Sequence, residues 1–208
     1  MDHTLSDVEV RVLGCLIEKE ITTPDYYPLS LNALVVACNQ SSNRHPVVHY
    51  DEETVEQAAD ALREKKLVHL IARGESRVTK YRHVVYEAMN MGRPDIALMC
   101  VLMLRGPQTA GEIRTRTNRL YDFATPEQVE TTLTALMAAN PPFVVRLPRQ
   151  TGQKEVRFAH LLSGEVQMSG LEVEPEVQSE IEPDRIDKLE REVAQLRREF
   201  EEFRKKFE

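Results

Sequence analysis

TPEQVETTLTAL, residues 125–136, repeats the pattern of an earlier segment, DEETVEQAADAL, residues 51–62. In both segments a residue that commonly caps helices, Asp51 or Thr125, precedes apolar residues spaced three and four positions apart. This spacing puts the apolar side chains on one face of a helix. The later segment also has Gln128 at the position that closes a capping box. The sequence therefore predicts the same amphipathic helix twice.

The elements on either side of these two helices match as well. A shorter helix precedes each of them, capped by Ser30 in the first copy and by Thr109 in the second. An apolar run of strand character follows each of them, and then a polar turn that contains a glycine. The return strands contain His83 and His160. Repetition of a whole set of elements predicts one supersecondary unit used twice.

The predicted unit, helices followed by a two-stranded hairpin, is typical of a winged helix. We therefore expect an α+β, mostly helical fold with two tandem winged-helix (winged helix-turn-helix) domains followed by a C-terminal helix. The expected segments are 1–90 and 91–164 for the two domains, 165–184 for an acidic linker and 185–208 for the helix. Each domain lies near the lower size limit for independent folding, so we expect the two to support each other.

Length and composition indicate a water-soluble protein. The chain has 208 residues, of which 41% are hydrophobic. Its longest apolar run, residues 96–104, is much shorter than the roughly 18 residues of a membrane span and predicts a buried helix. The N-terminus lacks the basic start and apolar core of a signal peptide. We expect a cytoplasmic location.

The three cysteines are expected to be reduced and buried. Cys15, Cys38 and Cys100 all fall within predicted helices, where a free cysteine behaves as a small hydrophobic residue. Cys38, His45 and His49 offer three metal ligands in principle, but the sequence has no Cys-x-x-Cys pair and no evident fourth ligand. We predict neither a metal nor a cofactor.

The sequence does not favour an enzyme. It contains no phosphate-binding glycine loop, no His-Glu-x-x-His motif and no Gly-x-Ser-x-Gly elbow, and its 8 glycines are scattered. Its many carboxylates fall on helix faces or in the C-terminal segment, where solvated side chains are the usual interpretation. We expect a binding protein without catalytic residues.

Two stretches resemble a known family. These are TTPDYYPLSLNAL, residues 22–34, and CNQSSNRHPV, residues 38–47, which resemble the bacterial YceH family. The likeness extends over about residues 4–162 and implies two winged-helix domains in a family without an established biochemical activity. The family-motif loop contributes Asn39, Gln40, Ser42, Asn43, Arg44 and Pro46.

The motif loop is longer than the corresponding connection in the second copy. Ser42 and Asn43 favour a turn, and Pro46 restricts the residue before it to an extended conformation. Arg44 has two possible roles, binding an anion or tying the loop to an acidic helix. We favour the structural role.

Charge differs more between the two copies than their patterns do. Lys and Arg number 10 against 14 Asp and Glu in residues 1–90, 9 against 6 in 91–164, and 8 against 14 in 165–208. The helix that begins after Asp51 is strongly acidic, whereas its counterpart offers Gln128, Thr131 and Thr134. Only the second copy is positively charged.

This charge pattern supports two functions equally well. The first is nucleic-acid binding, DNA above all, through the second domain. Its candidate residues are Arg114, Arg116, Arg119, Arg146, Arg149, Lys154 and Arg157. The second is a scaffold in which both domains, including the acidic first one, bind protein. The sequence pI of about 5.5 opposes nucleic-acid binding, because such proteins are usually basic.

Residues 165–184 contain no Lys or Arg and seven acidic residues. We interpret them as a solvated spacer, with folding back onto the basic wing of the second domain as the alternative. Beyond them, apolar residues alternate spacings of three and four, the seam of a coiled coil that favours a parallel homodimer. These are Ile186, Leu189, Val193, Leu196, Phe200, Phe203 and Phe207. The competing interpretation is a helix that packs on its own domains.

Overall fold

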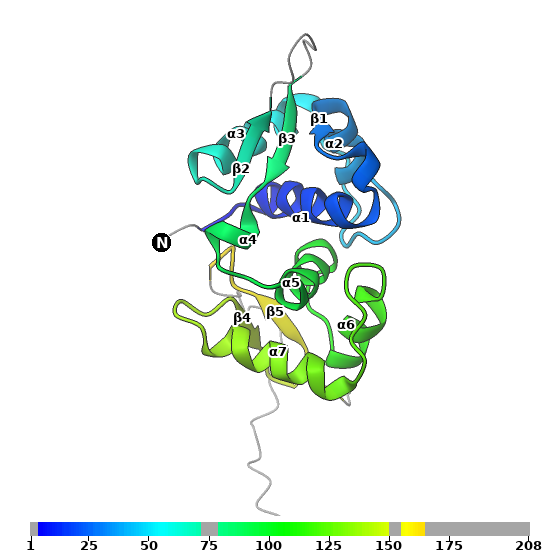
Figure 1. The fold of residues 1–208 in the computed structure, drawn as a ribbon, viewed down its shortest axis with the longest axis vertical. Helices are drawn as coiled ribbons and strands as arrows, with labels where there is room; N and C mark the ends of the chain where they lie inside the picture. Colours follow the sequence, from blue (N-terminus) through cyan, green and yellow to red (C-terminus); the bar gives the residue numbers. More distant parts are fainter. Residues whose placement is uncertain (1–3, 72–78, 150–154, 165–208) are drawn as a thin grey trace, which may run out of the picture. The chain divides into compact units, whose positions relative to one another are not determined.

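The computed structural model describes residues 4–71, 79–149 and 155–164. This part of the chain is α+β, as predicted, with about half of its residues in helices and two small antiparallel sheets (Figure 1). We call residues 4–90 the first half and residues 91–164 the second half. None of the helices described is long and apolar enough to cross a membrane. The predicted C-terminal helix lies outside the described residues.

The first half contains three longer α-helices, one short α-helix, one 3-10 helix and a three-stranded sheet. Its elements are α1 (Asp7–Thr22), η1 (Pro24–Tyr26), β1 (Leu29–Ser30), α2 (Leu31–Cys38), α3 (Glu52–Glu64), β2 (Val68–Ile71), β3 (Lys80–His83) and the short α4 (Val85–Ala88). The strand order is β1-β3-β2, with Leu29 opposite Tyr81 and Val68 opposite His83.

The second half repeats this order with a smaller sheet. Its elements are α5 (Arg93–Arg105), α6 (Ala110–Thr117), α7 (Pro126–Ala138), β4 (Val144–Arg146) and β5 (Phe158–His160). β4 and β5 pair antiparallel, with Val144 opposite His160. A single bridge between Gln108 and Phe158 takes the place that β1 has in the first half. The predicted repetition of elements is therefore present in the backbone.

Three of the four predicted helix caps are present. The side chains of Ser30, Asp51 and Thr109 accept hydrogen bonds from backbone N–H groups in the first turns of α2, α3 and α6. The capping box predicted at Thr125 and Gln128 is wrong.

The Thr125 side chain makes no capping bond, and Gln128 Oε1 accepts from the backbone N–H of Ala124 at 3.0 Å. The Gln128 side chain is therefore bound one residue before the position that a capping box requires. The pKa of Glu127 is lowered, first by its own backbone N–H and then by the Thr125 side chain.

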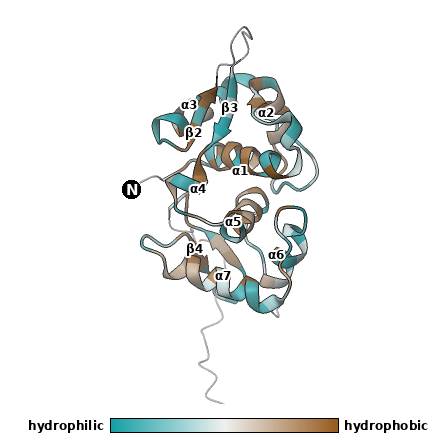
Figure 2. Ribbon diagram, viewed as in Figure 1, coloured by the Kyte–Doolittle hydropathy of each residue, from teal (hydrophilic) through white to brown (hydrophobic). Residues whose placement is uncertain are grey.

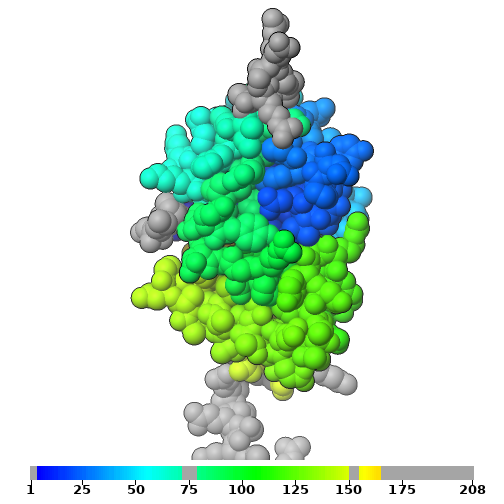
Figure 3. Space-filling view, in the orientation of Figure 1, coloured from blue at the N-terminus to red at the C-terminus, as the bar shows by residue number. Residues whose placement is uncertain are grey.

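The two halves share one hydrophobic core. α1 packs against α5, and every residue from Ile96 to Leu104 is buried, as predicted for this apolar run (Figure 2). At Gly14 the helices approach so closely that an added Cβ would lie 2.9 Å from Leu104 Cδ2. On the face drawn in Figure 3, the blue and cyan residues of the first half and the lime residues of the second meet across the green segment that joins them.

The histidines in the two return strands have different surroundings. His83 is buried, its Nδ1 accepts from the backbone N–H of Val85, and its Nε2 lies 2.9 Å from a Glu20 carboxylate oxygen. His160 Nδ1 is buried without a hydrogen-bond partner in the described part of the chain. Burial lowers the pKa of His160 to about 4, and Asp7 opposes this shift only weakly. The same position in the repeat therefore has a carboxylate neighbour at hydrogen-bond distance in the first half only, among the residues described.

The low pKa of His160 predicts a loss of stability in acid. An unfolded chain protonates this histidine below its ordinary pKa of 6.5, whereas the folded protein keeps it neutral down to about pH 4. Lowering the pH from 7 to 4 should therefore remove about 3 kcal/mol of unfolding free energy through this residue. Urea denaturation of the wild type and of His160→Gln at both pH values measures the difference. An identical pH dependence in the two proteins would contradict the prediction.

Candidate functional site

The predicted arginines of the second half fall into two groups. The arginines of the first group form ion pairs or hydrogen bonds with other groups of the protein. Arg116 pairs with Glu112 one turn away on α6 at 3.3 Å, and Arg157 pairs with the same carboxylate at 3.0 Å. Arg157 also donates to the carbonyl of Pro107 at 2.8 Å. Glu112 thus offsets part of the charge of both candidate arginines.

Arg114 belongs to this first group in part. It is exposed on α6, and its guanidinium donates to the carbonyls of Phe123 and Ala124 at 3.5 and 3.3 Å. These contacts lay the side chain across the turn between α6 and α7. Its charge has no carboxylate partner among the residues described.

The second group consists of Arg119, Arg146 and Arg149. All three are exposed, and none forms an ion pair within residues 4–71, 79–149 and 155–164. α6 ends at Thr117, so Arg119 lies in the turn between α6 and α7. Arg146 ends β4, and Arg149 follows it. Lys154 lies outside the described residues.

The exposed face of α7 is polar, but several of its side chains already form hydrogen bonds with nearby backbone groups. The hydroxyls of Thr131 and Thr134 donate to the carbonyls of Glu127 and Glu130, each at 2.8 Å. The Gln128 side chain is bound to the turn before the helix. These side chains of α7 therefore already use part of their hydrogen-bonding capacity on nearby backbone groups.

The corresponding helix of the first half is acidic. Glu52, Glu53 and Glu56 are exposed on α3, and Asp60 is offset only by an exposed pair with Arg63 at 3.4 Å. Part of this face borders a hollow of about 550 Å³ that also contains Leu70 and Tyr81. Such a surface repels phosphate.

The family-motif loop is tied to the protein by Arg44. The Arg44 side chain is buried and donates to both carboxylate oxygens of Glu18 on α1, at 3.0 and 2.6 Å. It also donates to the carbonyl of Ala37 at the end of α2. Burial lowers the pKa of Arg44, but the hydrogen-bonded Glu18 carboxylate more than offsets this effect. The net pKa of Arg44 is raised, so the guanidinium stays charged. Of the two roles considered, the contacts are those of a structural link.

The other motif residues support the same loop. The Asn39 side chain accepts from the backbone N–H of Tyr50 at 2.8 Å and donates to the backbone carbonyl of Tyr50 at 2.7 Å. Gln40 accepts from Arg44 at 3.2 Å. Asn43 has a positive φ of 59°, and its side chain accepts from Arg105. The Pro46 carbonyl accepts from Arg11 at 2.6 Å, and Ser42 is exposed.

The cysteines are buried and free, as expected. Cys15 Sγ donates to the carbonyl of Ala37 at 3.3 Å, and Cys100 Sγ to that of Gly14 at 3.5 Å. Cys38 is buried whereas His45 and His49 are exposed. Within the described ranges, no three potential ligands are grouped as a metal site.

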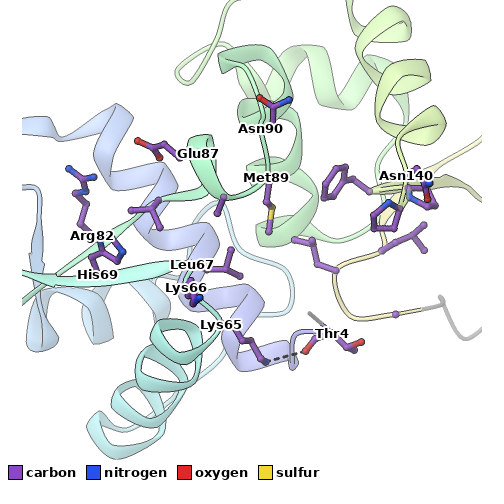
Figure 4. A pocket seen from close by; sticks show the side chains of 18 residues that line it. Thr4, Lys65, Lys66, Leu67, His69, Arg82, Glu87, Met89, Asn90 and Asn140 are labelled. Atoms are coloured by element: carbon purple, nitrogen blue, oxygen red, sulfur yellow. Dashed lines mark hydrogen bonds between the residues drawn. The ribbon is translucent and has the colours of Figure 1, made fainter. Parts of the chain in front are cut away.

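Sequence reasoning missed a groove of about 850 Å³ where the two halves meet (Figure 4). Its lining comes from the α3–β2 turn, from β2 and β3, from the segment around α4, from the loop before β4 and from the residues after β5. Figure 4 shows Met89 pointing into it, with Leu67 and Lys66 on one side and Asn140 on another. Because these residues are distant in the sequence, no local pattern indicates them. The predicted seam residues from Ile186 to Phe207 lie outside the described residues.

Comparison with known proteins finds relatives of similar length. Residues 5–153 match a family model described as "Protein of unknown function, DUF480". A UPF0502 protein of Solibacter usitatus is 55% identical over the full length of both chains. One of Opitutus terrae is 54% identical over 93% of this chain and 83% of its own, and one of Geotalea uraniireducens is 50% identical over the full length of both.

Proposed function

Since this chain belongs to the UPF0502 family, and the family model that it matches names no activity, we propose from the charges on its surface that the second half binds the phosphate backbone of nucleic acid. The contacts are made by Arg119, Arg146 and Arg149. Each half is a winged helix in this proposal, and the protein is a binding protein without catalysis.

The order of elements supports the winged-helix assignment. In each half three helices precede an antiparallel hairpin, and one further backbone pairing joins the hairpin to the segment between the first two helices. In proteins of this kind the third helix and the wing approach a duplex together. Arg119 lies in the turn before that helix, and Arg146 and Arg149 lie on the wing.

The observation that carries the proposal is the difference in charge between equivalent surfaces. α3 exposes Glu52, Glu53 and Glu56, whereas the second half exposes arginines without carboxylate partners in the described structure. Phosphate contacts need such cations, because much of the affinity for nucleic acid comes from the release of condensed counterions.

The state of α7 favours contact with the backbone over reading of bases. Side chains that recognise bases need free donors and acceptors aimed into a groove. Thr131 and Thr134 already donate to their own helix, and Gln128 is bound to the preceding turn. We therefore expect binding with little sequence preference.

Reversing the three arginines should remove this binding. We expect the variant Arg119→Glu, Arg146→Glu, Arg149→Glu to lose at least about a hundredfold in affinity for a duplex. Each substitution removes a phosphate contact and adds repulsion between the new carboxylate and the phosphate. Fluorescence anisotropy with a labelled duplex at low salt measures this. Arg63→Glu on α3 is a control with the same kind of charge reversal on the first half. Unchanged affinity of the triple variant would place any binding elsewhere.

A protein partner on the first half is the second candidate. One observation favours it: Leu70 is 37% exposed in a hollow bordered by Glu52 and Glu56. Capture from lysate with and without nuclease separates the two candidates. A partner that survives nuclease treatment and is lost in Glu52→Lys, Glu56→Lys supports the scaffold function.

Self-association through residues 185–208 is a further part of the proposal. The heptad spacing of Leu189 and Leu196 is the support for a parallel dimer. We expect sedimentation of the full chain to give twice the monomer mass, and Leu189→Asp, Leu196→Asp to give the monomer. A full chain that sediments as a monomer would contradict the coiled coil.

A further inference from the structure

We propose that the groove between the two halves is the docking site of the chain's own next segment, residues 165–172. The proposal does not depend on nucleic-acid binding, because the groove and the three arginines share no residue. Four features carry it: the apolar floor, the charged rim, the place where the described chain ends, and the sequence that follows.

The floor of the groove is apolar. Leu67 and Leu162 are nearly fully buried in its walls, whereas Met89 and Phe143 are only partly covered and face it. Pro141 adds further apolar surface. Partly covered apolar side chains in a concave site gain about 25 cal/mol per Å² when a ligand removes them from water. The groove is therefore suited to apolar side chains.

The rim of the groove is mainly cationic. Lys66 and Arg82 are exposed cations, and neither has a carboxylate partner among the described residues. In Figure 4 Arg82 and His69 lie together at one end. Lys65 is already engaged with Glu9, and Glu87 is the one carboxylate in the lining described. An occupant with acidic residues next to apolar ones matches this surface.

The described chain ends inside the groove. Gly164 lines it, with a positive φ of 86°, and its N–H donates to the carbonyl of Leu161 at 3.0 Å. The turn is anchored, because the Leu5 N–H donates to the carbonyl of Leu162 at 2.7 Å. Whatever follows Gly164 therefore starts at the groove.

The sequence that follows has the required chemistry. Residues 165–172 are EVQMSGLE, with Glu165 and Glu172 at the ends and Val166, Met168 and Leu171 between them. Eight residues span at most about 29 Å when extended. A tethered segment has an effective concentration in the millimolar range, so even a weak site is occupied.

Zero-length cross-linking of the full chain tests the proposal. A carbodiimide should join the Lys66 amine to the carboxylate of Glu165 or Glu172, giving a cross-linked peptide in protein of monomer mass. Lys66→Arg keeps the charge but removes the amine, so this product should disappear. Lys80, on β3 but outside the groove lining, is the matched amine that should not couple to these carboxylates.

Amide exchange provides the second measurement. Met168→Glu, Leu171→Glu should speed exchange around Met89 and Phe143 about tenfold, the factor expected if the site is nine-tenths occupied, and leave α3 unchanged. Three results would overturn the proposal. Glu165 or Glu172 could cross-link to Lys154 of the predicted wing and not to Lys66, or cross-links could form only between two isotopically distinct copies of the chain. The third is the absence of any such cross-link together with unchanged amide exchange in the Met168→Glu, Leu171→Glu variant.

Discussion

Replacing Arg44 by alanine should lower the free energy of unfolding by about 3–5 kcal/mol, the usual effect of removing one partner of a buried ion pair. The substitution leaves the Glu18 carboxylate, which is only 13% exposed, without its two donors. It also removes the guanidinium donors to the Ala37 carbonyl, and with them the link from the motif loop to α1 and α2. Urea denaturation of the full chain measures the loss.

Two controls separate burial from charge. Asp60→Asn breaks the exposed pair with Arg63 and should cost less than about 1 kcal/mol. Replacing both Glu18 and Arg44 by methionine should recover much of the stability, since paired apolar residues avoid the desolvation penalty. If Arg44→Ala cost no more than Asp60→Asn, the loop would not depend on this pair.

Leu104→Ala should cost about 2–5 kcal/mol, the range for a buried leucine whose removal leaves a cavity. Leu104 is 3% exposed, and its Cγ and Cδ2 lie over Gly14, where α5 crosses α1. Because the halves share one core, we expect amide exchange to accelerate in both α3 and α7. Acceleration confined to α7 would show that the halves unfold separately.

A second substitution tests the contact itself. Gly14→Ala alone places a Cβ 2.9 Å from Leu104 Cδ2, so Leu104 has to move. In the Leu104→Ala background the same Cβ no longer meets Leu104 and keeps one tight contact, 3.3 Å to Met103 Cβ, so part of the gain of about 1 kcal/mol in helix propensity should appear. The two substitutions should therefore be strongly non-additive in urea denaturation. Additive effects would mean that the helices do not touch at this point.

Much of the fold follows from local sequence. Ser30, Asp51 and Thr109 indicate helix starts because a cap acts within one turn, and apolar spacing indicates the buried faces. The predicted box at Thr125 is absent, since the Thr125 side chain makes no capping bond and Gln128 accepts from Ala124 instead. The short helix α4 was not predicted, because four residues are too few to show a period.

The candidate site depended on contacts that no local pattern contains. Two of the candidate arginines, Arg116 and Arg157, share Glu112, and Arg157 lies far from it along the chain. The groove was missed for the same reason, since its walls join residues from both halves. By contrast, the acidic character of α3 follows directly from its own sequence.

The two halves therefore combine a repeated backbone with different surfaces. The first half has a long motif loop fixed by Arg44 and an acidic third helix. The second half has no such loop and exposes cations around the turn and the wing. This difference is what the proposed function depends on.

The dependence of duplex binding on salt tests the central proposal most directly. Three arginine contacts predict that the logarithm of the affinity falls with the logarithm of salt concentration with a slope of about −3, from about 0.9 per phosphate neutralised. The Arg119, Arg146, Arg149 triple variant should show no such slope, and Arg63→Glu should keep it. A full chain whose binding is absent, or unaffected by salt, would contradict the proposal that the second half binds phosphate.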